Sequence, residues 1–300
     1  MTYTLSELFD LVQQPLPYPG GFSGRGVVIS AGGPFLPCAY IAVRSLRHFG
    51  CTLPVQIWHL GSAELPSAIV PAFEQWGVTF VDSFEVCKQW PVRRLGGWEN
   101  KPYAIMHSPF EEVLLIDADN MVLQDPTSLF DSPLYRTNGS LFWSDFLPEG
   151  DPFWAIRPGA WKLLGLSPEV GAEIESGQLL IDKRRCWKPL AITMHMNENA
   201  EFFYKECSHG DKDTFTLSWR LAGVAAGLAP FRPRLTCDPV RLHFDEAGVP
   251  LFQHSRKWGF PAGNNPSIES FLLEAECFEW LRELERELER DLETSSPRSL

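Results

Sequence analysis

The sequence lacks several features that would assign it to a well-marked class of protein. Its seven cysteines form no C-x-x-C pair, and their odd number leaves at least one thiol unpaired, so they indicate neither a disulfide framework nor a cysteine metal site. The first residues lack the basic residues and the following apolar segment of a signal peptide. No stretch of the sequence approaches the roughly 18 uninterrupted apolar residues of a membrane span. We therefore expect reduced thiols, no transmembrane segment and a cytoplasmic location.

Basic residues are also scarce. The chain of 300 residues has 26 lysines and arginines against 38 aspartates and glutamates, a net charge of -12. Nucleic-acid binding needs a basic face that neutralises backbone phosphates, so we expect no nucleic-acid partner. The remaining composition, 44% hydrophobic and 21% charged, is ordinary for a folded chain with a sizeable core.

Short apolar runs alternate with helical patterns through the first third of the chain. Strands are predicted at 26–30, 54–60 and 78–81, with helices at 36–49 and 66–76 between them. This βαβ rhythm predicts an α/β fold with an open, mostly parallel sheet flanked by helices.

The next apolar run, residues 113–116, ends in Asp117, Ala118 and Asp119. Because side chains alternate along an extended backbone, the two carboxylates point the same way where the strand leaves the sheet. Paired carboxylates are ligands that Mg²⁺ and Mn²⁺ prefer, and without a cation they would repel each other. The alternative is a strand end capped by ordinary turn residues.

Two stretches could bind a nucleotide. Gly32 and Gly33 follow the first strand and would let the backbone approach a ligand, with Arg44 on the helix that comes next. Lys101 stands at the start of a helix over 98–107 and could reach a diphosphate. The alternatives are a glycine turn in a plain βα unit and a solvated helix end.

Two polar segments in the second half could face a ligand. Glu175 to Gln178 is predicted to form a polar turn before a strand, and both end residues could hydrogen-bond hydroxyl groups. Asp211 and Asp213 open a later helix with Lys212 between them. A hairpin turn and simple helix capping are the competing interpretations.

Near the end, His254 and Lys257 follow a short apolar strand, and residues 268–293 form a long helix pattern with Glu and Arg pairs at i, i+4 spacing. A lone histidine is more often a core residue than a ligand. We interpret the helix as solvated and available for a contact between chains.

In this order, four segments resemble the fungal α-1,3-mannosyltransferase family and, more distantly, the glycogenin-like retaining glycosyltransferases. They are ISAGGPFLPCAYIAVRSLRHFGCTLPVQIW, NKPYAIMHSPFEEVLLIDADNMVLQDP, ESGQLLIDK and HGDKDTFTLSW. The resemblance covers roughly residues 25–260. It implies a GT-A fold with a nucleotide-sugar half at about 25–130, an acceptor half at about 131–266, and residues 267–300 as a C-terminal helix and disordered tail.

The resemblance also implies roles for single residues. Asp117, Asp119 and His254 would hold Mn²⁺ or Mg²⁺ on the donor diphosphate, and Lys257 would contact that diphosphate. The late signature of the glycogenin-like enzymes is degraded here, since Arg256 and Lys257 precede Trp258 without the usual Gly and Pro. Glu175, Gln178, Asp211 and Asp213 would surround the sugar, with Lys212 in place of the relatives' Gln.

The expected function is transfer of a sugar, with retention, from a nucleotide-diphosphate sugar to a hydroxyl group of a glycan, a protein or a small molecule. GDP-mannose is the expected donor. Three alternatives stay open: a UDP-sugar-dependent transferase of the same fold, a sugar nucleotidyltransferase, and a non-catalytic carbohydrate-binding protein. A sugar nucleotidyltransferase would be expected to carry an arginine in its glycine-rich loop, and the corresponding segment here, AGGPFLP, has none.

Overall fold

A computed structural model of the chain describes residues 3–145, 156–169, 173–237 and 239–295. The fold is built around a seven-stranded sheet in the order β3-β2-β1-β4-β7-β6-β8. Its strands are β1 (Arg25–Ser30), β2 (Val55–His59), β3 (Val78–Asp82), β4 (Glu112–Asp117), β6 (Ser140–Ser144), β7 (Ile174–Asp182) and β8 (Gly227–Leu228). All neighbours pair in parallel except β7, which is antiparallel to both β4 and β6. The expected mostly parallel sheet is therefore confirmed.

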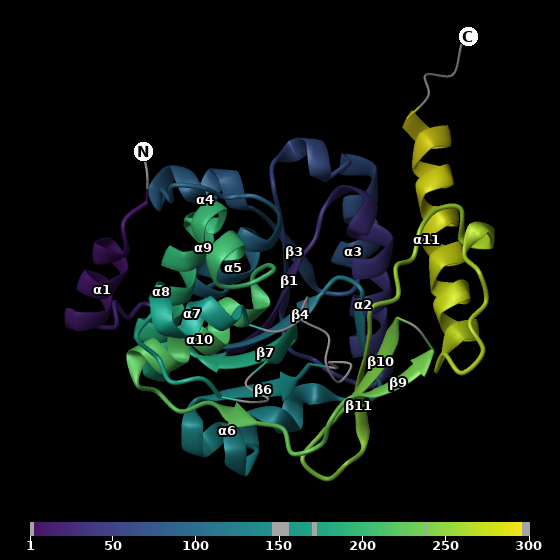
Figure 1. Cartoon of the computed structure of the whole chain (residues 1–300). Helices are drawn as coiled ribbons and strands as arrows, with labels where there is room; N and C mark the ends of the chain where they lie inside the picture. The colour runs from purple at the N-terminus through teal and green to yellow at the C-terminus, as the bar shows by residue number, and fades with distance from the viewer. Residues whose placement is uncertain (1–2, 146–155, 170–172, 238, 296–300) are drawn as a thin grey trace.

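Helices cover both faces of this sheet (Figure 1). One face carries α2 (Leu36–His48) and α3 (Val70–Glu74), and the other carries α5 (Asn100–His107), α8 (Lys183–Glu198) and α10 (Lys212–Ala222). The alternation of side chains along β4 explains how one strand serves both layers, because Leu114 and Ile116 pack on the α2 side while Val113 and Leu115 pack on the α5 side. Four further helices are α1 (Leu5–Gln13), α4 (Ser83–Gln89), α6 (Pro133–Asn138) and α7 (Pro158–Leu163), and α9 (Ala200–Glu206) follows α8.

A second sheet of four strands lies beside the first, in the order β5-β11-β10-β9. Its strands are β5 (Asn120–Val122), β9 (Arg234–Cys237), β10 (Val240–Phe244) and β11 (Pro250–His254), all antiparallel. Since β5 follows β4 after two residues, the chain passes from the large sheet to the small one at the D-x-D segment.

The C-terminal helix α11 (Glu274–Ser295) packs along α2 (Figure 1). It begins six residues later than the predicted start at 268, and its apolar side, with Cys277, Leu281 and Leu284, is buried within the same chain. That side is therefore not solvated, which corrects our interpretation. A contact between chains through this helix stays a prediction, as does the division into donor and acceptor halves, and the end of the expected tail, 296–300, lies outside the described residues.

Two other local predictions were wrong. Glu175 to Gln178 is not a turn but the interior of β7, since the residues pair with β4 and β6 on either side. The helix predicted at 66–76 is shorter, a 3-10 turn at Ser67–Ile69 leading into α3. Short 3-10 turns also lie at Gly33–Phe35, Ser62–Glu64, Gly97–Glu99, Pro126–Asp131 and Ala262–Asn264. Within the described residues, none of the helices combines the length and apolar character needed to cross a bilayer.

Candidate active site

A cavity of about 300 Å³ opens at the carboxyl ends of β1, β2 and β4. In an open α/β sheet this edge is where ligands bind. Its lining combines backbone, aromatic and charged groups, namely Ser30, Ala31, Gly32, Phe35, Trp58, Leu60, Glu64, Gly97, Trp98, Asn100, Lys101, Asp117, Ala118, Asp119 and Lys257. Five of the residues expected from the sequence therefore meet here: Gly32, Lys101, Asp117, Asp119 and Lys257.

His254 joins the two aspartates from the second sheet. It pairs with Asn120 in the ladder between β11 and β5, which places it next to the D-x-D segment. Its Nε2 atom lies 3.4 Å from Asp119 Oδ1 and 3.9 Å from Asp117 Oδ2. One ligand atom from each of the three residues falls within 4.8 Å of the others. Two carboxylates and an imidazole grouped in this way fit a divalent cation such as Mn²⁺.

The electrostatics of the three residues are coupled. Burial raises the pKa of Asp117 to about 6, against the opposing effects of Lys101 and His254. Burial also acts to raise the pKa of Asp119, but the contact with His254 outweighs it, and this pKa falls below its usual value. For His254, burial favours the neutral ring, yet Glu175 and Asp119 raise the pKa to about 10. Without a metal, the protonated ring of His254 therefore balances part of the carboxylate charge, and a bound cation would take the place of the Nε2 proton.

Lys101 supplies part of that charge. Its Nζ atom lies 2.8 Å from Asp117 Oδ2 and 3.3 Å from Asp211 Oδ2, and it donates to Ser176 Oγ at 3.3 Å. Burial acts to lower the pKa of Lys101, but Asp117 and Asp211 raise it above its ordinary value. Lys101 is therefore a fixed cation that ties the D-x-D strand to Asp211, at the start of α10.

The glycine loop and Lys257 lie on the rim of the cavity. A Cβ on Gly32 would meet Glu64 Oε2 at 2.3 Å, so the absence of a side chain there lets this carboxylate approach. Gly33 has a φ of 52°, which favours glycine, but it is not among the lining residues. Lys257 is exposed, with its Nζ 5.6 Å from the centre of the Phe35 ring. Its amine can move toward a bound anion.

Arg44 does not reach the cavity, which corrects the expectation that it binds the donor. Its guanidinium forms an ion pair with Glu283 of α11 and lies 4.2 Å from the ring centre of Trp76 and 5.4 Å from that of Trp280. Helical spacing placed Arg44 on the outer side of α2, where the C-terminal helix covers it. Arg44 therefore stabilises the packing of α11.

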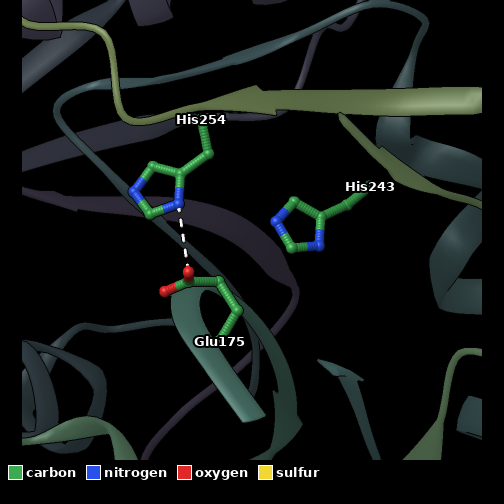
Figure 2. A group of neighbouring side chains, drawn as sticks. All are labelled: Glu175, His243 and His254. Carbon is green, nitrogen blue, oxygen red and sulfur yellow. Dashed lines mark ion pairs between the residues drawn. The ribbon is translucent and has the colours of Figure 1, made fainter. Parts of the chain in front are cut away.

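The four residues expected around the sugar are buried, and none of them is among the residues that line the cavity. Gln178 accepts a hydrogen bond from Asn120 Nδ2 at 2.7 Å. Asp213 has no hydrogen-bond partner for either carboxylate oxygen among the described residues, and burial raises its pKa to about 7. Glu175 points at His254, with its Oε2 atom 3.4 Å from Nδ1 (Figure 2). Asp211 is also buried, but it contacts Lys101.

Sequence reasoning missed several residues of this site. Glu64 and Trp58 come from the segment around the end of β2, and their place at the same sheet edge as the glycine loop is the signal that could have identified them. His243, on β10, faces Glu175 and His254 (Figure 2). No local pattern marks His243, because the carboxylate it faces, Glu175, comes from β7, a strand far away in the sequence.

Comparisons with known proteins give relatives of the chain in sequence and in fold. The model of a family described as "Mannosyltransferase putative" matches residues 24–153 and 168–226, more than half of the chain. Among curated proteins, the chain is 28% identical over 237 residues to the alpha-1,2-mannosyltransferase MNN22 of Candida albicans, covering 63% of this chain and 39% of that protein. It is 25% identical over 284 residues to the alpha-1,2-mannosyltransferase MNN2 of Saccharomyces cerevisiae, covering 78% of this chain and 46% of the relative. The chain thus spans less than half the length of these relatives.

Two solved structures share the architecture. The glycosyltransferase GlyE of Streptococcus pneumoniae matches with a TM-score of 0.51 at 17% identity, covering 93% of this chain and 66% of that one. An active-site mutant of LgtC matches with a TM-score of 0.51 at 18% identity, covering 86% and 95%. At these identities the similarity shows the fold alone, and it confirms the expected GT-A fold.

Proposed function

The chain belongs to this mannosyltransferase family, and from that membership we propose that it is a metal-dependent, retaining glycosyltransferase that moves mannose from GDP-mannose to a hydroxyl group. One observation supports this proposal most strongly. Asp117, Asp119 and His254, from two different sheets, converge at the mouth of a cavity that also holds Lys101 and Lys257. A metal ion at these three residues and the two lysine amines would place positive charge at one edge of the α/β sheet. That charge suits the diphosphate group of a sugar donor.

Asp117, Asp119 and His254 would hold Mn²⁺ or Mg²⁺, which when bound supplies positive charge to the diphosphate that departs. The protein adds two amines. Lys101 is fixed between Asp117 and Asp211, so it presents its charge without reorganisation. Lys257 is exposed on the rim and can close on the donor.

The remaining cavity residues suit the nucleoside. Phe35 and Trp98 line the cavity while 42% and 54% of their surface stays exposed, which is high for large apolar side chains. Such faces are available to stack on a base or a sugar ring. Glu64, beside Gly32, adds a carboxylate that can accept hydrogen bonds from a base or a ribose.

Retention of configuration is consistent with the relatives. Their names specify α-linkages, and mannose is also α-linked in GDP-mannose. In the proposed reaction the bond from the anomeric carbon to the diphosphate oxygen breaks, and a bond to the acceptor oxygen forms on the same face. The hydroxyl proton passes to the departing diphosphate, so no protein nucleophile is required. Asp211, at the start of α10, lies 3.3 Å from Lys101 and places a carboxylate beside the proposed donor site.

The test is a transfer assay with GDP-mannose, Mn²⁺ and a panel of α-mannosides, in which mass spectrometry detects the product and NMR assigns the new linkage. We expect addition of one hexose and an α-linkage. UDP-glucose and UDP-galactose in parallel reactions test the donor. Transfer from a UDP-sugar alone would overturn the mannosyl assignment, release of pyrophosphate from a nucleoside triphosphate and a sugar phosphate would indicate a nucleotidyltransferase, and sugar binding without turnover would indicate a binding protein.

A further inference from the structure

His254 faces the two aspartates with one ring nitrogen and a third carboxylate with the other. Its Nε2 atom points toward Asp117 and Asp119, whereas Nδ1 lies 3.4 Å from Glu175 Oε2 (Figure 2). Both side chains are buried, with 6% of His254 and 9% of Glu175 exposed. Glu175 therefore contacts the ring on the side away from the cavity.

The segment around Glu175 is shaped to hold this ring. The other oxygen of the carboxylate, Oε1, accepts a hydrogen bond from the backbone N–H of Gly177 at 2.9 Å, which fixes the direction of the side chain. A Cβ on Gly177 would lie 2.4 Å from His254 Cε1, so the ring packs directly on this glycine. The carbonyl of Gly177 accepts a hydrogen bond from Asn120 Nδ2 at 2.7 Å. This bond connects the segment around Glu175 to the residue that follows Asp119.

A metal binds the nitrogen of a histidine that carries no proton, and a carboxylate that accepts from the opposite N–H selects that tautomer and orients the ring. We propose that Glu175 is a positioning residue, which accepts a hydrogen bond from His254 Nδ1 and so presents the Nε2 lone pair to the cation held by Asp117 and Asp119. This inference rests on the metal site of the proposed function and deepens it.

His243 completes the surroundings of the carboxylate. It is buried on β10, its ring centre lies 6.4 Å from that of His254, and its Nε2 atom has no hydrogen-bond partner among the described residues. Among the described residues, Glu175 forms its ion pair with His254, at 3.4 Å.

The test measures Mn²⁺ binding to the full chain, from the electron paramagnetic resonance signal of free Mn²⁺, for the wild type, Glu175→Gln, Glu175→Leu and His243→Phe. Glu173→Gln, which removes a carboxylate from the same segment, is the matched control. We expect one ion per chain, binding about 10-fold weaker in Glu175→Gln, weaker still in Glu175→Leu and unchanged in the control. ¹⁵N NMR of His254, recorded with diamagnetic Mg²⁺ in place of Mn²⁺, should show the Nδ1–H tautomer in the metal-bound wild type and a mixture of tautomers in Glu175→Gln.

Each other outcome has a defined meaning. Equal Mn²⁺ affinity and an unchanged tautomer in Glu175→Gln would overturn the positioning role while the metal site stands. A second ion that is lost in His243→Phe would also overturn it, because Glu175, His243 and His254 would then themselves ligate a metal. No Mn²⁺ binding by the wild type would contradict the proposed function as well. Glu175→Gln is nearly isosteric, so it keeps the test valid if Glu175→Leu fails to fold.

Discussion

His254 lies directly opposite Asn120 in the antiparallel ladder between β11 and β5, and Asn120 follows Asp119 in the chain. This single pairing brings a residue from the last strand to the two aspartates at the end of β4. The candidate metal site therefore depends on the alignment of the small sheet with the large one. A shift of one residue in this ladder would turn His254 to the other face.

The first prediction concerns Asp119. Replacing it with Asn removes one charged ligand but keeps the size of the side chain, so Mn²⁺ affinity should fall by about 100-fold and transfer should be abolished. The melting temperature of the metal-free protein should change little. Isothermal titration with Mn²⁺ and the transfer assay check both expectations.

Asp10→Asn, on the exposed side of α1, is the control for this loss of one carboxylate. It should bind Mn²⁺ and transfer sugar as the wild type does. Full turnover by Asp119→Asn would refute the metal role of this residue.

Gly177 gives the second prediction. Alanine at this position would place its Cβ 2.4 Å from His254 Cε1 and 2.7 Å from Nδ1, which is too close for the ring to stay in place. Mn²⁺ binding should weaken by at least about 10-fold, since an imidazole displaced from its site is a poor ligand. Gly159→Ala, where the added Cβ meets nothing within 4 Å, is the matched control and should bind Mn²⁺ normally. Equal affinity in the two variants would show that His254 is not a ligand.

The strands, the D-x-D segment and Lys101 could be predicted from the sequence because they depend on local patterns. Apolar runs of β-forming residues set the strands, and the carboxyl end of β4 fixes where Asp117 points. The polar residues of β7 were misread as a turn. Gly177 lies inside a strand, where the missing side chain makes room for the ring of His254 from the other sheet, and no local pattern shows that contact.

The role of Arg44 could not be predicted for a similar reason. An arginine beside a glycine loop is compatible with phosphate binding, but its partner Glu283 lies more than two hundred residues later in the chain. Periodicity tells which face of a helix is polar and not which distant element will cover that face.

Arg44 therefore gives a prediction about stability and not about ligand binding. Arg44→Ala removes the ion pair with Glu283 and the contact with Trp76, so the free energy of unfolding should fall by about 2 kcal/mol. Urea denaturation measures this change. The affinities for Mn²⁺ and GDP should stay as in the wild type. A selective loss of GDP binding would show that Arg44 does contribute to donor binding.

His107 predicts how stability depends on pH. Burial lowers its pKa from 6.5 to about 4 in the folded protein. Between these pH values the unfolded chain binds a proton that the folded chain does not, so the free energy of unfolding falls as the pH drops from 6.5 to 4, by up to about 3 kcal/mol. His107→Gln should flatten this part of the profile. An unchanged profile in His107→Gln would show that other groups cause the acid sensitivity.

The most direct test of the metal-assisted donor site is a thermal-shift measurement with GDP, UDP, ADP and CDP, each with and without Mn²⁺, on the wild type and on Asp119→Asn. A ligand that binds only the folded state raises the melting temperature. We predict that GDP stabilises the wild type only when Mn²⁺ is present and does not stabilise Asp119→Asn under either condition. Stabilisation by GDP that is independent of Mn²⁺ and equal in the two proteins would contradict a donor site built on Asp117, Asp119 and His254.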